Sequence, residues 1–181
     1  MAGCTCAVTG HGMMAAVLML LIRHADAGSR RDWAGDDRDR PLTEAGVRQA
    51  RDLAGVLAKH NPALIATSPY QRCLQTVVPL AQMSGLPVVP VDDLGVQGAP
   101  HAGRTLRALA RSGTGPRLAR STDDPVIAVC THGEVIAAGL RSTGAAELAD
   151  GAEIPGPKGG TWLLSFTGDV VVSAELLPPP S

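Results

Sequence analysis

The sequence predicts an α/β fold in which helices cover both faces of a mostly parallel β-sheet. Short apolar runs without alternation are separated by segments whose apolar residues recur every three or four positions, as on one face of a helix. Near the end of the chain, two more apolar runs flank Thr167-Gly168-Asp169, which is typical of a tight turn. We therefore expect a three-layer α/β/α architecture that ends in a C-terminal antiparallel hairpin.

The first third of the chain contains one strand, one loop and one helix. Residues 17–22 do not alternate and predict a strand that is buried on both faces. Residues 25–40 interleave arginine with aspartate and predict a solvated loop rather than a lid over an anion. Pro41 and Thr43 then predict the start of a helix, with Thr43 as the N-cap, and this helix is expected to run to about residue 60.

The middle of the chain repeats the pattern. Residues 63–66 predict a short second strand, and Ser68-Pro69 predicts a helix with serine as N-cap and proline in the first position. Pro79 lies inside this helical pattern, so we expect a kink or an early break there. Gly85 ends the segment, and residues 87–91 predict a third strand.

The last part supplies the remaining elements. Residues 92–100 predict a loop, 105–111 a short helix and 112–124 an irregular segment. A strand at 125–130 precedes a helix at 134–141, and the Gly- and Pro-rich residues 144–160 predict a loop. The hairpin strands are expected at 161–166 and 170–174.

The 181 residues are enough for one domain with a buried core. We expect a flexible leader at 1–16, the domain at 17–176 and a disordered Pro-rich tail at 177–181. The apolar stretch at 13–22 has about half the length that a membrane-spanning helix needs. The net charge of −1 and the aromatic content of 2% argue against nucleic acid or a membrane surface as a partner.

Four cysteines do not form a metal-binding pattern. Cys4 and Cys6 are too close together for half of a zinc site, whereas Cys73 and Cys130 lie in helical and strand patterns and are expected to be buried thiols. This use of cysteine fits a reducing cytoplasm.

Polar residues follow three of the predicted strands, at Arg23-His24, Thr67-Ser68 and Thr131-His132. The carboxyl ends of parallel strands meet at one edge of a sheet, where α/β folds bind their ligands. We therefore expect these three strand exits to converge on a single crevice.

The residues at these exits suit phosphoryl transfer, which needs a nucleophile and positive charge around the phosphate oxygens. His24 is the candidate nucleophile, because the adjacent Arg23 disfavours the charged imidazolium. Arg23 and Arg72 can bind the oxygens, and a protonated His132 can add charge in the transition state. A helix start near Glu134 directs free N–H groups at the same place. No metal or cofactor is required by this chemistry.

Four segments resemble, in order and at compatible spacing, motifs of the histidine phosphatase superfamily, the phosphoglycerate mutase-like proteins. They are Leu21-Ile22-Arg23-His24-Ala25-Asp26, Arg40-Pro41-Leu42-Thr43-Glu44-Ala45-Gly46, Ser68-Pro69-Tyr70-Gln71-Arg72-Cys73-Leu74-Gln75-Thr76 and Thr131-His132-Gly133. The resemblance covers about residues 18–140 and is closest to the small SixA-type phosphohistidine phosphatases. It implies a phosphoglycerate mutase-like fold, phosphorylation of His24, phosphate contacts from Arg23 and Arg72, and His132 as the second pocket histidine.

Two departures from the family pattern concern the site. Ala25 replaces a glycine, which is tolerable only if the backbone there does not need a positive φ. No glutamate follows Leu94, where larger relatives carry a general acid, so Glu134, Asp93 and Asp26 remain as candidate proton donors, with Asp92 a further possibility beside Asp93. A missing acid favours a labile phosphoryl donor over an alkyl phosphate.

The sequence thus predicts a metal-independent cytoplasmic phosphatase that works through a phosphohistidine on His24. Its substrate is expected to be a phosphorylated small molecule or a phosphoprotein, as a phosphomonoester or a phosphoramidate such as protein phosphohistidine. The alternatives are a phosphoglycerate mutase-like phosphotransferase and an inactive module that binds phosphorylated partners.

Overall fold

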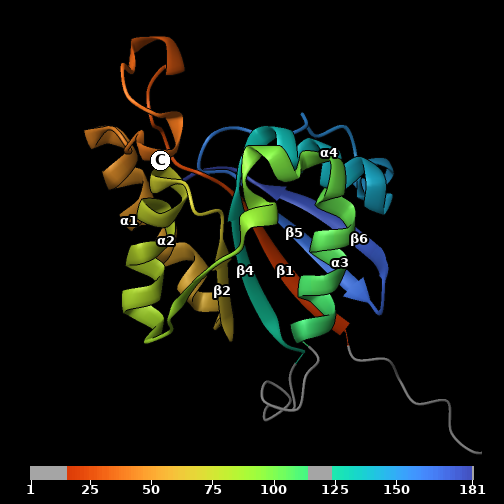
Figure 1. The fold of residues 1–181 in the computed structure, drawn as a ribbon. Coiled ribbons are helices and arrows are strands. Elements are labelled where there is room, and N and C mark those ends of the chain that lie inside the picture. Colours follow the sequence, from red (N-terminus) through yellow and green to blue (C-terminus); the bar gives the residue numbers. More distant parts are fainter. Residues whose placement is uncertain (1–15, 114–123, 181) are drawn as a thin grey trace, which may run out of the picture.

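The computed structural model describes residues 16–113 and 124–180, and it contains a six-stranded sheet in the order β3-β2-β4-β1-β5-β6 (Figure 1). The strands are β1 (Ala16–Arg23), β2 (Leu64–Thr67), β3 (Val88–Pro90), β4 (Val126–Thr131), β5 (Thr161–Thr167) and β6 (Val170–Leu177). The first four in space are parallel, and β5 and β6 are antiparallel additions. This confirms the mostly parallel sheet with a C-terminal hairpin.

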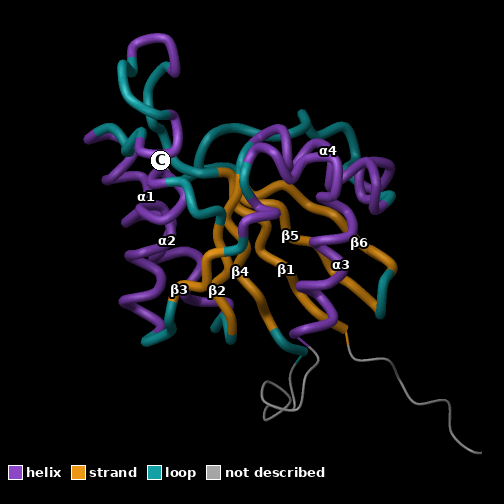
Figure 2. The backbone as a smooth tube through the Cα atoms, viewed as in Figure 1, coloured by secondary structure: helices purple, strands orange, loops and turns teal. Residues whose placement is uncertain are grey.

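Within the described residues, four α-helices are present, and Figure 2 shows that they form the outer layers. They are α1 (Glu44–Leu57), α2 (Gln71–Ser84), α3 (Ala102–Gly113) and α4 (Gly133–Thr143). Helices α1 and α2 pack together on one face of the sheet, and α3 and α4 pack together on the other. The α/β/α prediction is confirmed. None of the helices among the described residues has the length and apolarity that crossing a membrane requires.

The central strand β1 shows why its sequence does not alternate between apolar and polar residues. Met19 and Leu21 lie in the core cluster that includes residues of α3 and α4. Leu20 and Ile22 lie in the cluster that includes residues of α1 and α2. Because helices cover both faces, side chains on both sides of the strand are buried in apolar surroundings.

Helix α1 begins where its capping residue predicts, and α2 does not. The hydroxyl of Thr43 accepts a hydrogen bond from the Gly46 backbone at 3.0 Å. Helix α2 begins at Gln71 with Tyr70 as N-cap, so the predicted cap at Ser68 is wrong. The Ser68 hydroxyl instead bonds His132 at 2.8 Å, which takes it out of a capping role.

Pro79 does not break α2, which continues to Ser84. Proline removes one backbone hydrogen bond from a helix interior. Val77 and Leu80, on either side of Pro79, are both buried in the core, so packing against the sheet holds both halves of the helix in place.

Several boundaries differ from those predicted. Helix α3 starts at Ala102 and is longer than expected, and the expected loops contain 3₁₀ turns, at residues 30–32, 37–39, 92–94, 96–101 and 145–148. Strand β6 reaches Leu177, one residue beyond the expected end of the domain, and Pro180 lines a pocket with residues of α1. The expected leader up to residue 15, residues 114–123 of the expected irregular segment and Ser181 lie outside the described residues.

Candidate active site

Three neighbouring strand ends bring the pocket residues together. The backbone N–H of His24 donates to the carbonyl of Thr131 at 3.0 Å, and that of Ser68 donates to Cys130 at 2.9 Å. These bonds extend the β1–β4 and β4–β2 ladders one residue beyond the strands. His24, Ser68 and His132 therefore lie side by side at the carboxyl edge of the sheet, where the sequence placed them.

His24 is buried, with 7% of its surface exposed. Its Nδ1 donates to the carbonyl of Ala25 at 2.8 Å, so in the neutral ring Nε2 carries the lone pair. Arg72 Nε donates to this Nε2 at 3.3 Å. Burial and the charges of Arg72 and Arg23 lower the pKa of His24 to about 4, although the bond to Ala25 opposes this. The ring is therefore neutral at pH 7, with Nε2 able to act as a nucleophile.

His132 faces His24, with 5.4 Å between the ring centroids. Its two nitrogens contact Ser68 Oγ at 2.8 Å and Arg72 Nη2 at 3.2 Å. Burial, followed by the charge of Arg72, lowers the pKa of His132 to about 3. In these surroundings the ring is thus neutral at pH 7, unlike the protonated His132 that the sequence suggested for the transition state.

Arg72 is almost fully buried and bonds both histidines. Its guanidinium carbon lies 4.7 Å from the centroid of the Tyr70 ring, and that ring also packs edge-on against His132. A planar cation held between an aromatic face and two imidazoles is well suited to bind a phosphoryl group.

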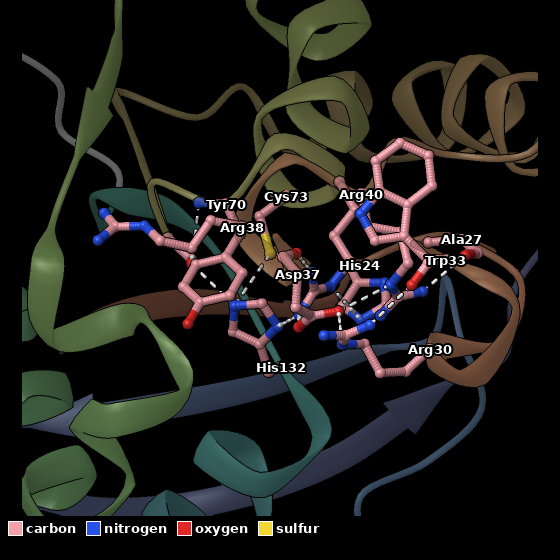
Figure 3. Close-up of polar contacts among 12 residues, drawn as sticks. His24, Ala27, Arg30, Trp33, Asp37, Arg38, Arg40, Tyr70, Cys73 and His132 are labelled. Carbon is pink, nitrogen blue, oxygen red and sulfur yellow. Dashed lines mark hydrogen bonds and ion pairs between the residues drawn. The ribbon is translucent and has the colours of Figure 1, made fainter. Parts of the chain in front are cut away.

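Asp37, which the sequence left in a solvated loop, lies in this pocket (Figure 3). Its backbone carbonyl accepts from Arg72 at 2.6 Å, and its carboxylate accepts from Arg72 at 3.0 Å and from Arg40 at 2.8 Å. Arg30 adds an ion pair at 3.3 Å. Burial alone would raise the pKa of Asp37, but Arg40 and Arg72 hold it below its usual value. Asp37 is therefore an ionised carboxylate on the anion-binding side of Arg72.

Among the described residues, Arg23 forms no hydrogen bond with His24, Arg72 or His132. Its guanidinium packs against Gly133, where an added Cβ would come within 3.3 Å of Arg23 Cζ. Arg23 donates to the carbonyl of Gly156, whereas its buried Nε has no partner among the described residues. The Nε of Arg23 is thus an unpaired but buried donor beside the first turn of α4.

The three predicted proton donors do not contact either histidine. Asp26 is bound by Lys158 at 2.7 Å and by Thr43 at 2.8 Å, and the bond to Lys158 lowers the pKa of Asp26. Glu134 is exposed in the first turn of α4. Asp93 is exposed on the wall of a cavity of about 420 Å³ that Tyr70 also lines. No hydrogen bond or ion pair joins any of the three to a pocket histidine within the described part of the chain.

Ala25 fits its position without strain. It is not among the described residues with positive φ, so the glycine of the family pattern is not needed for backbone conformation. Its backbone N–H donates to Thr76 Oγ1 at 3.0 Å, and its methyl group is buried beside Ala27 and Leu42.

Residues outside the recognised motifs also hold the loop that carries His24. Gln49 accepts from the Asp26 backbone at 2.9 Å and donates to the carbonyl of Lys158 at 2.9 Å. The N–H of Gly159 lies 3.1 Å from the carbonyl of Arg23 and 3.2 Å from that of His24. Nothing in the Gly- and Pro-rich sequence of the 144–160 segment signalled these contacts.

Across the described residues, no group of three His, Cys, Asp or Glu side chains is placed to hold a metal ion. Cys73 and Cys130 are buried free thiols, as predicted.

Comparison with known proteins connects this site to a family. The family model described as the histidine phosphatase superfamily (branch 1) matches residues 19–96. The 8-oxo-(d)GTP phosphatase of Mycolicibacterium smegmatis is 32% identical over 168 residues, which cover 90% of this chain and 48% of that protein. The glucosyl-3-phosphoglycerate phosphatase of Mycolicibacterium vanbaalenii is 39% identical over 74 residues, covering 39% of this chain and 32% of that protein. The chain spans about half or less of the length of these relatives.

Solved structures show the same fold. The protein histidine phosphatase SixA, complexed with tungstate, aligns with a TM-score of 0.67 and 21% identity over 90% of this chain and 97% of its own. A mycobacterial glucosyl-3-phosphoglycerate phosphatase complexed with VO3 aligns with a TM-score of 0.66 and 21% identity over 92% of this chain and 100% of its own. The fold and the paired histidines define an α/β protein of the phosphoglycerate mutase-like type. Residues 19–96 carry the match to the histidine phosphatase superfamily, and the curated proteins that the chain resembles include phosphatases.

Proposed function

We propose that the protein is a phosphatase that transfers a phosphoryl group from its substrate to His24 Nε2 and then to water. The observation that carries the proposal is the state of His24. Its Nδ1–H is held by the carbonyl of Ala25, and its unprotonated Nε2 faces Arg72 inside a pocket that contains a second histidine. A neutral, oriented imidazole beside a buried guanidinium is the arrangement that nucleophilic attack on phosphorus requires.

The first step forms the bond between His24 Nε2 and phosphorus and breaks the bond to the leaving group. Arg72 donates to the phosphoryl oxygens, His132 contacts another oxygen, and Arg23 adds positive charge near His24. Water then attacks the phosphohistidine, which releases inorganic phosphate and restores the neutral ring. Asp37 forms an ion pair with Arg72 at 3.0 Å, so the incoming phosphoryl group displaces its carboxylate.

The substrate range follows from the leaving group. The acids Asp26, Asp93 and Glu134 make no contact with the pocket histidines among the described residues, which favours phosphoryl donors that leave without strong acid assistance. We propose a phosphomonoester with a good leaving group or a phosphoramidate, including protein phosphohistidine, as the substrate. Free buried thiols at Cys73 and Cys130 support a cytoplasmic setting.

The test is His24→Ala with a chromogenic aryl phosphate as the substrate. We expect turnover to be abolished, together with an acid-labile phosphoenzyme that the parent protein forms. Glu175→Gln, at an exposed position of β6, serves as a folded control with a phosphoenzyme of normal lability. Turnover by His24→Ala would refute the nucleophile. Phosphate binding without any trapped phosphoenzyme in the parent protein would identify an inactive binding module instead.

A phosphoglycerate isomerisation assay decides between hydrolysis and the mutase alternative. A mutase returns the phosphoryl group to the sugar acid and releases little inorganic phosphate. We expect release of inorganic phosphate to dominate, because Asp26, Asp93 and Glu134 make no contact with the pocket histidines among the described residues and Asp37 is held ionised by Arg40 and Arg72.

A further inference from the structure

A cavity of about 420 Å³ begins one side chain away from the phosphoryl pocket. The side chains that line it include Arg38, Tyr70, Asp92, Asp93 and Gln97. Tyr70 is the shared wall, because its ring also contacts Arg72 and packs edge-on against His132. The phenol donates to Gln97 Oε1 at 3.0 Å, which holds the ring in this orientation. A substrate whose phosphoryl group binds Arg72 can therefore place the rest of its structure in this cavity.

Arg38 supplies positive charge to the wall of this cavity. Its guanidinium carbon lies 5.7 Å from the centroid of the Tyr70 ring (Figure 3), compared with 4.7 Å for that of Arg72. The backbone N–H of Arg38 bonds Asp36, but its guanidinium forms no hydrogen bond or ion pair within the described part of the chain. The neighbouring Asp37 uses its carboxylate for other arginines. The donors of Arg38 are therefore available beside the ring that Arg72 also contacts.

Asp92 and Asp93 also line the cavity, and both residues are exposed to solvent. Neither carboxylate forms an ion pair with Arg38 across the described residues. Asp93 also lines a neighbouring cavity that neither Arg38 nor Tyr70 reaches, so it lies where the two cavities adjoin. An anionic group attached near phosphorus therefore meets the guanidinium of Arg38 before it meets Asp93.

We propose that this cavity is the subsite for the leaving group and that Arg38 selects leaving groups that carry a carboxylate or a second phosphate. A planar guanidinium offers paired N–H donors that match the oxygens of both groups. Contact with the Tyr70 ring keeps this guanidinium close to Arg72. The inference rests on the proposed function, because it takes the transferred phosphoryl group to bind Arg72, whereas Arg38 contacts the group that leaves.

The test uses aryl phosphonates, which are not hydrolysed because a carbon–phosphorus bond replaces the scissile bond. Meta- and para-carboxyphenylphosphonate carry a carboxylate at two distances from phosphorus, and para-phenylenediphosphonate carries a second phosphonate. The corresponding carbamoyl compounds are uncharged matches of the carboxylates. Calorimetry measures Kd at a pH where every phosphonate is a dianion. We expect the parent protein to bind at least one charged ligand about fivefold more tightly than its carbamoyl match. The tighter of the two charged kinds identifies the group as carboxylate or phosphate.

Three variants assign the preference to Arg38. Arg38→Met keeps the apolar length of the side chain beside Tyr70 and removes the charge, so the preference should disappear while the carbamoyl compounds bind as before. Arg38→Lys should keep part of the preference, because it keeps the charge without the paired donors. Arg31→Met is the matched control. It removes an exposed arginine of the 3₁₀ turn at residues 30–32 that does not line the cavity, and it should keep the full preference.

Each outcome decides the matter. Equal affinity of the parent protein for charged and uncharged ligands would overturn the proposal, as would a preference that survives in Arg38→Met. An equal loss in Arg31→Met would also overturn it, because net charge would then explain the preference. Failure of every phosphonate to bind would refute the phosphoryl pocket and the subsite together. A charge preference in a protein that turns over no aryl phosphate would uphold the subsite and refute the proposed catalysis, and turnover without the preference would do the reverse.

Discussion

Arg72 connects the residues of the pocket to one another. Its Nε contacts His24, one terminal nitrogen contacts His132, and both terminal nitrogens contact Asp37. Because the side chain is buried, these donors have few alternatives in water. The same guanidinium therefore lowers the pKa of both histidines and offers the main binding group for an anion.

We predict that Arg72→Ala and His132→Ala each lower kcat/KM for an aryl phosphate by about 10²–10³, the usual effect of losing one donor to a developing oxyanion. The phosphoenzyme should still be detectable in both variants, since His24 is intact. Steady-state kinetics with single-turnover trapping measures this. Activity near that of the parent protein in both variants would mean that neither side chain reaches the reacting phosphoryl group.

Asp37→Asn is predicted to tighten inhibition by inorganic phosphate about tenfold, because the phosphate no longer has to displace an ionised carboxylate from Arg72. Asp39→Asn removes an exposed carboxylate from the same 3₁₀ turn and should leave the inhibition constant unchanged. Weaker inhibition in Asp37→Asn would show the reverse role, in which Asp37 holds Arg72 in its binding position.

The sequence could predict His24, Arg72 and His132 because each lies in a short motif whose chemistry is local. Asp37 was not predictable in the same way. It lies in a run where arginine and aspartate alternate, and such a run has the same composition whether it is solvated or folded over a pocket. Its role depends on the ion pair with Arg72, which is 35 residues away in the chain.

Helix α1 and the loop after β1 fit together through one glycine. A Cβ on Gly46 would lie 1.9 Å from the carbonyl oxygen of Asp26, and backbone cannot move away cheaply. That carbonyl also accepts from the Thr43 backbone at 3.0 Å, so the first turn of α1 packs directly against the segment that follows His24.

We predict that Gly46→Ala lowers the free energy of unfolding by about 2–3 kcal/mol and reduces activity by shifting the loop of His24. Gly55 lies in the same helix, and nothing lies within 4 Å of the carbon that alanine would add. Gly55→Ala should therefore raise the free energy of unfolding by about 0.5–1 kcal/mol. Urea unfolding of both variants tests the pair. Equal effects would mean that helix propensity, and not contact with Asp26, governs Gly46.

The elements themselves illustrate what local patterns can predict. Helix α1 could be predicted because its N-cap and its apolar stripe both lie within one short continuous stretch of sequence. The start of α2 was missed because Ser68, a good cap by type, is bonded instead to a histidine 64 residues later. Pro79 was expected to disturb the helix, but tertiary packing of Val77 and Leu80 outweighs its local preference.

At the scale of the whole molecule, the site depends on the order of the strands. The parallel neighbours β2, β4 and β1 end at the same edge, which brings His24 and His132 together although 108 positions of the sequence separate them. The alternation of strands and helices along the chain predicts the three layers and the edge of the sheet at which ligands bind. It does not predict the neighbours within the sheet, because pairing is decided by long-range packing.

Burying two histidines beside arginines makes the stability of the whole fold depend on pH. The pKa of His24 falls from 6.5 to about 4 and that of His132 to about 3, so below pH 6.5 the unfolded chain binds more protons than the folded one. The free energy of unfolding therefore rises with pH in this range and falls on acidification. A shift of this size corresponds to roughly 2 kcal/mol for one histidine between pH 6.5 and pH 5.

We predict that the urea midpoint of the parent protein falls steadily from about pH 7 to about pH 5, a range in which ordinary carboxylates stay ionised. His24→Asn removes one of the two groups that must remain neutral, so its midpoint should change with pH by about half as much. His24 also lowers the pKa of His132, so replacing His24 brings the pKa of His132 closer to its ordinary value. The pH dependence of the urea midpoint should then fall by somewhat more than one half. A slope that is the same in both proteins would show that His24 titrates alike in the folded and unfolded chains.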